Sequence, residues 1–537
     1  MRAGTLAMVM AATWVWTSRA APITQTTAVR VALTDASCAT LVGAAVPPAA
    51  IGLPTTGAIV TSAEIVDDAS GRFCKVLGAI HPIDPKAPGI NVRINLPLAW
   101  NEKAVHLGGG GFNGTVPAGI RTNFPDPAAP SVLQQGYATL ASDSGHVATP
   151  GQDQAAFALN AEALANFAGD QLKKTHDVAV ELMRRAYGRP PRRMYFIGAS
   201  QGGHEALTVV QRYPKDYDGA VAFHPVYDLT ALHLDGVLLG QVLYNRPGGW
   251  VPADKVAMVS DKVHAACDAL DGLGDGIIAN VVACRRVFDV STLRCTNGVD
   301  AAGCLSDQQV ATFKTFASPI PLQVTLAGGI DTFAPWPVLE GGTMARSFGD
   351  SANKPAPGRM GGAAFAYAMG DQTTRYLLLK DPAADSLTFK PADHGPALQA
   401  LSRQLDASDT DVSSFRQRGG KLLLLHGTVD MAVPAGNTIA YHDKLKARYG
   451  AQLSSFVRLY VAPGFGHGNG NFVVGWDSLG ALDAWVDRGL TPGPQVVTDT
   501  NQATAGRQRP LCEHPAYPKY TGSGDVNAAS SFVCTAP

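Results

Sequence analysis

The sequence predicts an α/β protein with a mainly parallel sheet and a ligand site at the carboxyl ends of the strands. Several short apolar runs each end in a glycine-rich or polar loop, and a segment with helical periodicity lies between two of them. Alternating strands and helices are typical of parallel sheets, where ligands bind beyond the carboxyl ends of the strands. The hydrophobic content of 46% and the formal net charge of -1 suit a globular protein and do not favour nucleic-acid binding.

The first residues, MRAGTLAMVMAATWVWTSRAAP, have the features of a secretory signal peptide. An arginine precedes an apolar run from Leu6 to Trp16, and small residues follow around Ala20. The run is too short to cross a bilayer, and no later segment offers about 18 uninterrupted apolar residues. We therefore expect a signal peptide over residues 1–20, a secreted or periplasmic protein, and no membrane span.

The cysteines agree with export. Their number, eight, is even, and they form neighbouring pairs along the chain, which predicts disulfides. Many pairings are possible, and pairing of nearest neighbours is the simplest. A zinc site is disfavoured because no Cys-x-x-Cys occurs. The cysteines are Cys38, Cys74, Cys267, Cys284, Cys295, Cys304, Cys512 and Cys534.

The elements follow one another along the chain with one long interruption. The segment 170–187 places Val178, Leu182 and Met183 at helical spacing, which predicts a helix that covers the sheet. The interval 226–404 holds half of the cysteines, many Gly, Pro and Ala residues and few strand signals, so we predict an inserted domain there. The expected strands and their loops are 104–114, 137–146, 193–200, 217–225, 421–430 and 456–467.

The stretch YFIGASQGGHEAL, residues 195–207, passes from a strand into a helix within about two residues. It contains Gly-x-Ser-x-Gly, in which small neighbours allow a strained turn to expose the serine hydroxyl. The helix start behind Ser200 also offers free N–H groups to a negative charge. A glycine-rich turn with an incidental serine is the alternative in a chain with 57 glycines. The prediction of a nucleophile therefore depends on partners.

A serine nucleophile needs a base and an acid, which follow a serine elbow in the order Asp, His. Asp430 follows the most apolar run, in HGTVDMAVP, and His467 follows the next strand, in PGFGHGNG. A loop aspartate and a loop histidine are the alternatives. His426 is the nearest competing base among 13 histidines, but its place four residues before Asp430 favours packing or shaping of the turn.

The glycine-rich stretch HLGGGG, residues 106–111, predicts donors for an oxyanion. Backbone N–H groups at Gly110 or Gly111 could join that of Gln201. A flexible turn is the alternative. A dinucleotide-binding loop is disfavoured because no helix and no suitably placed acidic residue follow.

The stretch CDALDGLGDGII, residues 267–278, places three carboxylates within eight residues. Such crowding is costly unless a hard cation neutralises it, and calcium suits oxygen ligands. It is not an EF-hand, because the twelfth position counted from Asp271 is Val282 instead of glutamate. A solvated acidic turn is the alternative. The predicted ligands are the side chains of Asp268, Asp271 and Asp275 and the carbonyl groups of Leu273 and Ile277.

Together these motifs resemble the tannase and feruloyl esterase family. The matching text is YATLASDSGH, GASQGGHEAL, CDALDGLGDGII, RGGKLLLLHGTVD and RLYVAPGFGHGNG. The resemblance implies an α/β-hydrolase fold with catalytic segments 21–225 and 405–537, a lid domain at 226–404, a structural calcium ion in the lid, and locally paired cysteines. It also implies that Ser200 is the nucleophile, Asp430 the acid and His467 the base.

One departure from the family concerns the neighbours of the serine and the histidine. Family members usually have cysteines there, joined as a disulfide, whereas this chain has Ala199 and Gly468. Both cysteines are missing together, so no unpaired thiol remains. The tether between the two loops is lost, which weakens inferences about the substrate.

The sequence thus predicts a serine carboxylic-ester hydrolase that needs no cofactor for catalysis, and the resemblance implies that its substrates are small esters of aromatic carboxylic acids. Phe333 and Trp336, in DTFAPWP, are candidate contacts for an aromatic ring, although packing of the lid would also explain them. A serine peptidase on the same fold is one alternative. A non-catalytic binding protein is another, which would be expected to show a damaged triad or oxyanion loop.

Overall fold

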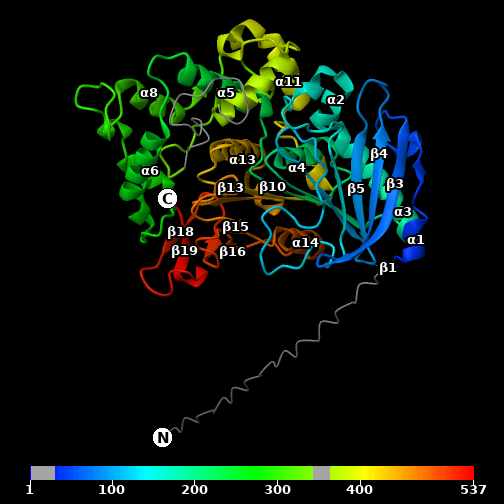
Figure 1. Ribbon diagram of the computed structural model, residues 1–537. Coiled ribbons are helices and arrows are strands. Elements are labelled where there is room, and N and C mark those ends of the chain that lie inside the picture. The colour runs from blue at the N-terminus through cyan, green and yellow to red at the C-terminus, as the bar shows by residue number, and fades with distance from the viewer. Residues whose placement is uncertain (2–30, 343–362) are drawn as a thin grey trace.

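The computed structural model describes the chain except for residues 2–30 and 343–362 (Figure 1). The predicted signal peptide lies outside the described residues, apart from Met1. Among the described helices, none combines the length and the apolar character that crossing a bilayer requires.

A ten-stranded mixed sheet forms the centre of the molecule (Figure 1). Its order is β14-β13-β10-β9-β7-β8-β5-β4-β3-β2. The half from β14 to β8 is parallel and consists of the apolar runs that the sequence predicts. These strands are β7 (Lys103–Leu107), β8 (Ala138–Ser142), β9 (Arg193–Ala199), β10 (Gly219–Phe223), β13 (Lys421–Gly427) and β14 (Val457–Ala462).

The other half of the sheet is antiparallel, and the sequence analysis did not anticipate it. Its long strands form a meander that joins the parallel half where β5 pairs with β8. A tight turn at Gly71, with φ of 112°, connects β3 to β4. A glycine at this turn was the feature of the sequence that could have indicated the hairpin. The expectation of a mainly parallel sheet therefore describes only the half that carries the site. The strands are β2 (Ala45–Val46), β3 (Gly57–Asp68), β4 (Gly71–His81) and β5 (Ile90–Pro97).

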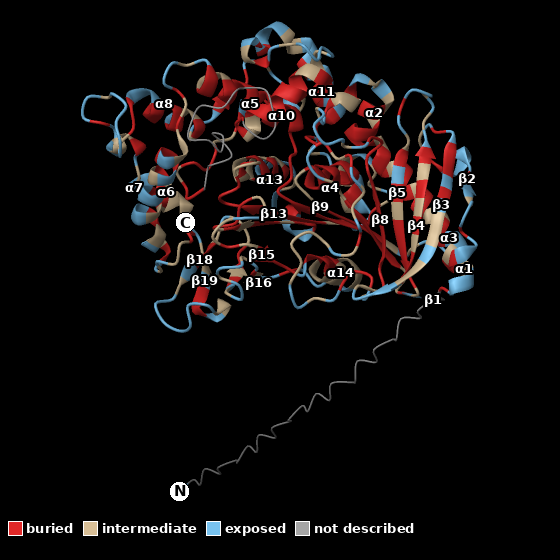
Figure 2. Ribbon diagram, viewed as in Figure 1, coloured by how far each residue is buried: buried red, intermediate tan, exposed pale blue. Residues whose placement is uncertain are grey.

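Helices cover both faces of the parallel half. Leu422 and Leu424 of β13 belong to a core shared with α4 and α13, whereas Leu423 and Leu425 pack in a second core with α14. Burial on both faces explains why these strands are continuously apolar. Figure 2 shows this burial along the central strands. The helices are α3 (Gln171–Tyr187), which corresponds to the predicted cover helix, α4 (Gln201–Arg212), α13 (Ala435–Tyr449) and α14 (Ser478–Arg488).

The chain leaves the sheet after β10 and returns at β13, its parallel neighbour. The segment between them forms a helical lid on the side of α13 (Figure 1). The two-stranded sheet of β11 (Ile320–Pro321) and β12 (Thr332–Phe333) belongs to it. The helices of this segment are α5 (Leu229–Tyr244), α6 (Ala253–Cys267), α7 (Val281–Val287), α8 (Asp307–Phe316), α10 (Phe365–Gln372), α11 (Gly395–Leu405) and α12 (Ser413–Gln417).

Smaller elements complete both ends of the chain. Near the N-terminus, β1 pairs with β6, and α1 lies beside β3 and is joined to β4 by the Cys38–Cys74 disulfide. The C-terminal region forms two small sheets near the lid, one from β15, β16 and β17 and one from β18 and β19. The bounds are β1 (Val31–Ala32), α1 (Asp35–Ala39), β6 (Ala99–Trp100), α2 (Ala161–Ala165), β15 (Val474–Gly475), β16 (Gln495–Asp499), β17 (Gln508–Leu511), β18 (Tyr517–Tyr520) and β19 (Phe532–Thr535).

All eight cysteines are paired in the structure. The bonds link nearest neighbours along the chain, and each closes a loop for which chain entropy gives about 2–4 kcal/mol of stability. Disulfides of this number are typical of proteins that fold in an oxidising compartment. The pairs are Cys38–Cys74, Cys267–Cys284, Cys295–Cys304 and Cys512–Cys534.

Candidate active site

Ser200 lies in a strained turn between β9 and α4. Its φ of 60° and ψ of -120° are unusual for a residue with a side chain. A Cβ atom added at Gly198 would lie 2.3 Å from the Gly202 carbonyl oxygen, and one added at Gly202 would lie 2.9 Å from the Gly109 carbonyl oxygen. The glycines of the Gly-x-Ser-x-Gly motif are therefore required by close backbone contacts, and the turn is the elbow that the sequence predicts.

Asp430 and His467 meet beside this elbow, each in the loop after a neighbouring parallel strand. Asp430 Oδ2 lies 2.8 Å from His467 Nδ1. The other carboxylate oxygen accepts hydrogen bonds from the N–H groups of Ala432 and Val433, at 2.8 and 2.9 Å. Asp430 is fully buried, whereas His467 is partly exposed and lines the same cavity as Ser200. The arrangement can hold one tautomer of His467 with its second nitrogen free for proton transfer.

The electrostatics of the pair favour a charged aspartate. Burial raises the pKa of the Asp430 carboxyl, but His467 and His224 outweigh this and hold the pKa well below its usual range. The pKa of His467 is raised from its ordinary value, because Asp430 outweighs the opposite effect of burial. The carboxylate thus stabilises the imidazolium that proton transfer from a serine would create.

The glycine-rich loop after β7 lies against the elbow. Gly110 and Gly111 line the cavity with Ser200 and Gln201. The loop is anchored by Glu205 of α4, which accepts hydrogen bonds from the Gly109 N–H group at 2.9 Å and from Asn113 Nδ2 at 2.7 Å.

Glu205 is a site residue that the sequence analysis missed. Its carboxyl is buried, and burial raises its pKa to about 7 despite the hydrogen bonds that it accepts. No local pattern distinguishes it from any other helical glutamate, because its partners lie far away in the sequence.

The cavity beside Ser200 has a volume of about 270 Å³ and a mainly apolar lining. Leu229 and Leu232 contribute from α5, and Phe365 and Met369 from α10. This volume is just below the ~300–1,000 Å³ range of small-molecule pockets, which suits a group with one ring.

Phe333 and Trp336, the predicted ring contacts, are not among the described residues that line this cavity. Both side chains are buried in the lid, and Trp336 Nε1 donates a hydrogen bond to Asp235 at 2.8 Å. The structure thus gives them the packing role that was the alternative. The ring contacts that α10 offers lie in a part of the chain without a recognisable motif.

A larger hollow of about 980 Å³ lies on the other side of α10. Its lining includes Arg375, which forms ion pairs with both Asp153 and Asp371. Neither Ser200 nor His467 lines it. The predicted nucleophile and the predicted base both line the smaller cavity instead.

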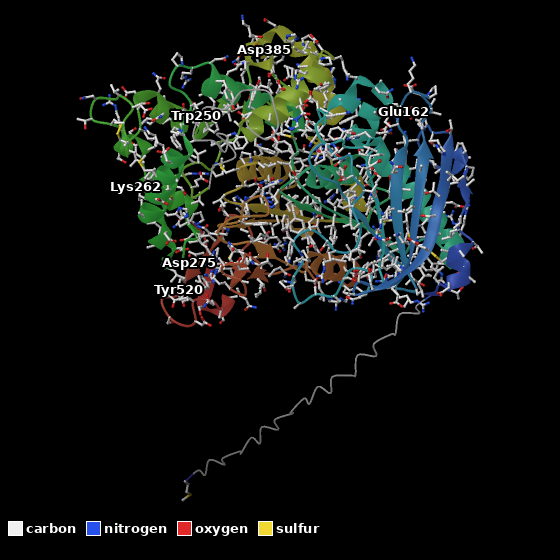
Figure 3. All side chains as sticks on the ribbon, in the orientation of Figure 1. Glu162, Trp250, Lys262, Asp275, Asp385 and Tyr520 are labelled. Atoms are coloured by element: carbon white, nitrogen blue, oxygen red, sulfur yellow. A yellow bond between two sulfur atoms is a disulfide. The ribbon has the colours of Figure 1, made fainter. Side chains whose placement is uncertain are left out.

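The acidic loop 267–278 packs against the C-terminal sheets (Figure 3). Asp268 and Asp275 each accept a hydrogen bond from a backbone N–H group of the loop, and Asp275 also pairs with Arg509 at 2.5 Å. Asp271 is buried, and its pKa is raised to about 7 by burial and by the neighbouring carboxylates. A cavity of about 20 Å³, large enough for one water-sized particle, borders Asp271 and Asp275.

This loop fits a calcium ion in donor chemistry, since all predicted ligand atoms are oxygens. The three carboxylates lie farther apart than the ligands of a compact metal site. Among the described residues, their oxygen atoms do not all lie within 4.8 Å of one another. Each of the three carboxylates accepts a hydrogen bond from a backbone N–H group of the loop. The donor types therefore fit the ion, while the carboxylates would have to turn toward it.

Comparison with known proteins identifies the family of the chain. The family model described as tannase and feruloyl esterase matches residues 74–535. An uncharacterized esterase of Agrobacterium fabrum is 38% identical, over 93% of this chain and 92% of the relative. Mono(2-hydroxyethyl) terephthalate hydrolase of Piscinibacter sakaiensis is 31% identical, over 87% and 85%.

Among solved structures, feruloyl esterase B of Aspergillus oryzae has a TM-score of 0.76 at 22% identity, covering 93% of this chain and all of that one. Tannin acyl hydrolase of Aspergillus niger has a TM-score of 0.68 at 20% identity, covering 94% and 95%. At these identities the likeness establishes the shared α/β-hydrolase type of fold.

Proposed function

The chain belongs to the tannase and feruloyl esterase family and is a carboxylic ester hydrolase, and from this we propose that it hydrolyses esters of aromatic carboxylic acids through a Ser200, His467 and Asp430 triad. The observation that carries the proposal is the contact of the buried Asp430 with His467, which lines one apolar cavity together with the strained Ser200.

In this mechanism Ser200 Oγ attacks the ester carbonyl carbon while His467 Nε2 accepts the serine proton. Asp430 holds the Nδ1–H group of His467 and stabilises the imidazolium. The proton then passes to the leaving alkoxide, so that the alcohol departs and an acyl-enzyme remains. A water molecule, deprotonated by His467, attacks this ester, and release of the acid restores the serine hydroxyl.

The tetrahedral oxyanion would be bound by backbone N–H groups of Gln201 and of Gly110 or Gly111. Such donors contribute most when they are fixed before the reaction. Glu205 supports this role, because it connects the glycine-rich loop directly to the helix that begins behind the nucleophile.

The aromatic acid is supported by the cavity and by the relatives. A flat ring suits an apolar space of about 270 Å³ lined by Leu232, Phe365 and Met369. Relatives are named for feruloyl esters and for a terephthalate ester, both derived from aromatic acids. The two kinds of observation are independent of each other.

A substrate panel tests the proposal. Purified protein is assayed on gallate, hydroxycinnamate and phthalate-type esters, on acetate and butyrate esters of the same alcohols, and on peptides, with the Ser200→Ala variant as control. Aromatic esters are expected to give kcat/KM values at least about tenfold above those of aliphatic esters. A preference for aliphatic esters would contradict the aromatic acid, and cleavage of peptides alone would favour a peptidase.

We also propose that calcium supports the lid structurally and that the protein is exported. The side chains of Asp268, Asp271 and Asp275, with the carbonyl groups of Leu273 and Ile277, would hold the ion, which takes no part in the ester chemistry. The four disulfides support folding outside a reducing compartment. N-terminal sequencing of the exported protein would test the signal peptide over residues 1–20.

A further inference from the structure

A second histidine contacts the aspartate of the site. His224 follows β10 directly, and its Nδ1 atom lies 2.8 Å from Asp430 Oδ2, the same oxygen that His467 contacts. Both His224 and Asp430 are fully buried. The rings of His224 and His467 are 5.1 Å apart between centroids. The sequence analysis missed His224, although it stands at the carboxyl end of a predicted strand.

Polar groups surround both oxygens of the Asp430 carboxylate. An ionised carboxylate offers about four lone-pair positions. The N–H groups of Ala432 and Val433 occupy Oδ1, while His467 and His224 approach Oδ2. His426 lies farther away, at 3.4 Å, and its Nε2 atom contacts the Val433 carbonyl oxygen at 2.7 Å. His224 is thus the second side chain, besides His467, at hydrogen-bond distance from Oδ2 of this fully buried anion.

The surroundings of His224 hold it in place without competing for its nitrogens. The rings of Phe124 and Phe465 pack against it, and its backbone N–H group donates to the Leu425 carbonyl oxygen at 2.8 Å. Its backbone φ of 46° is a conformation that histidine and asparagine tolerate better than most residues. Neither ring nitrogen has a well-aligned hydrogen bond among the described residues.

The protonation state of His224 limits what it can do. Burial lowers its pKa to about 4, although Asp430 acts in the opposite direction. Near neutral pH the ring is therefore uncharged and carries one N–H group. The distance to Asp430 suits a hydrogen bond but the angle does not, as is common for catalytic contacts before substrate binds.

We propose that His224 is a positioning residue for ester hydrolysis, which holds the Asp430 carboxylate through Oδ2 and moderates how strongly that carboxylate raises the basicity of His467. The proposal rests on the proposed triad. Loss of the His224 donor leaves more negative charge density for His467, so the imidazolium becomes more stable. The pKa of His467 then rises. As the pH is lowered, His467 therefore becomes protonated, and inactive as a base, at a higher pH than in the wild type.

The test compares His224→Leu, which removes the donor, with His224→Asn, whose Nδ2 atom is attached at the same Cγ position as His Nδ1. His224→Leu is expected to lower the plateau of kcat about tenfold and to move the acidic limb of the kcat/KM profile upward by about 0.5–1 pH unit. His224→Asn is expected to restore most of both quantities. KM should change little, because His224 does not line the cavity.

Two controls separate this role from simple packing. His442→Leu alters another histidine whose pKa burial lowers to about 4, and it is expected to leave the acidic limb unchanged. Backbone strain in His224→Leu would lower the melting temperature, but strain alone would not move the acidic limb. An unchanged limb in a folded His224→Leu protein, or an equal loss of kcat in His224→Asn, would overturn the proposal. Failure of the triad itself would be visible separately, as activity retained by Ser200→Ala.

Discussion

The strand ends of the core and the lid above them contribute different things to one site. Ser200, Asp430 and His467 stand in loops directly after three parallel strands, so the register of the sheet brings them together. The apolar walls of the cavity come from helices α5 and α10, which are more than 100 residues apart in the sequence. In the proposed mechanism the core therefore provides the catalytic groups, while the packing of the lid shapes the cavity beside Ser200.

The two regions also differ in how they pack. The core strands are apolar and buried on both faces. In the lid, glycines let α5 and α10 approach closely: a Cβ atom added at Gly236 would lie 2.2 Å from the Ala366 carbonyl oxygen, and one added at Gly240 would lie 2.1 Å from the Tyr367 ring. Changes in the core should therefore abolish turnover, whereas changes in the lid should alter substrate choice and stability.

The largest expected effect is that of Ser200→Ala. Turnover should fall by up to about a millionfold, as when a triad serine is removed elsewhere. The melting temperature should stay close to that of the wild type, because the hydroxyl contributes little packing. Single-turnover and steady-state assays with p-nitrophenyl esters, on protein produced without contact with wild type, measure this. Substantial residual turnover would remove Ser200 from the mechanism.

The next effect is that of Asp430→Asn, which keeps the shape of the side chain. It should reduce kcat by about 10⁴, because an amide no longer selects the productive tautomer of His467 or stabilises its charged form. KM should change less, since Asp430 does not line the cavity. If kcat fell less than about tenfold, another acid would have to support His467.

A smaller and different effect is expected from Gly240→Ala in the lid. The added methyl group collides with the Tyr367 ring, and overpacking of this kind costs about 1–3 kcal/mol. KM for aromatic esters should rise several-fold, while hydrolysis of p-nitrophenyl acetate should change little. Gly493→Ala is a control outside the lid, where the backbone φ is not positive and no heavy atom lies within 4 Å of the added Cβ. Equal loss on both esters would contradict the division between core and lid.

Removal of calcium should act through the lid. An ion bound only by the folded state adds RT ln(1 + [L]/Kd), about 2.7 kcal/mol at a concentration of 100 Kd. Chelation should lower the melting temperature first and activity afterwards, and Asp271→Ala should reproduce this without further response to chelator. If neither chelator nor added calcium moves the melting temperature, and elemental analysis finds no metal, the loop is a solvated turn.

The smallest expected effect concerns pH. Asp430 raises the pKa of His467 above its ordinary value of 6.5, and the triad needs His467 unprotonated. The kcat/KM value should therefore fall as pH decreases through a pKa above 6.5, and Asp430→Asn should move this limb to lower pH. A limb below pH 6.5 in the wild type would contradict the Asp430–His467 coupling.

Local patterns in the sequence determined the half of the fold that carries the chemistry. Runs such as Leu422 to Leu425 are continuously apolar because helices cover both faces, so the strands could be recognised one at a time. The elbow was recognisable because Gly198 and Gly202 leave no room for a side chain. Gly198 lies against Gly202, four residues away, and Gly202 lies against the neighbouring glycine-rich loop. The order of Ser200, Asp430 and His467 along the chain then indicated the grouping, and pairing of nearest neighbours among the cysteines corresponds to the disulfides in the structure.

Only the tertiary structure revealed contacts between residues far apart in the sequence. Glu205 anchors the loop of Gly109, and His224 contacts Asp430, which is 206 residues away in the sequence. The residues next to Glu205 and His224 in the sequence do not indicate these partners. The cavity is lined by Phe365 and not by Phe333 or Trp336. The close approach of α5 and α10 decides which aromatic side chains face the serine. Periodicity and motifs predict the local backbone conformation of each segment. The side chains that contact a buried carboxylate, in contrast, are decided by the tertiary fold that brings them to it.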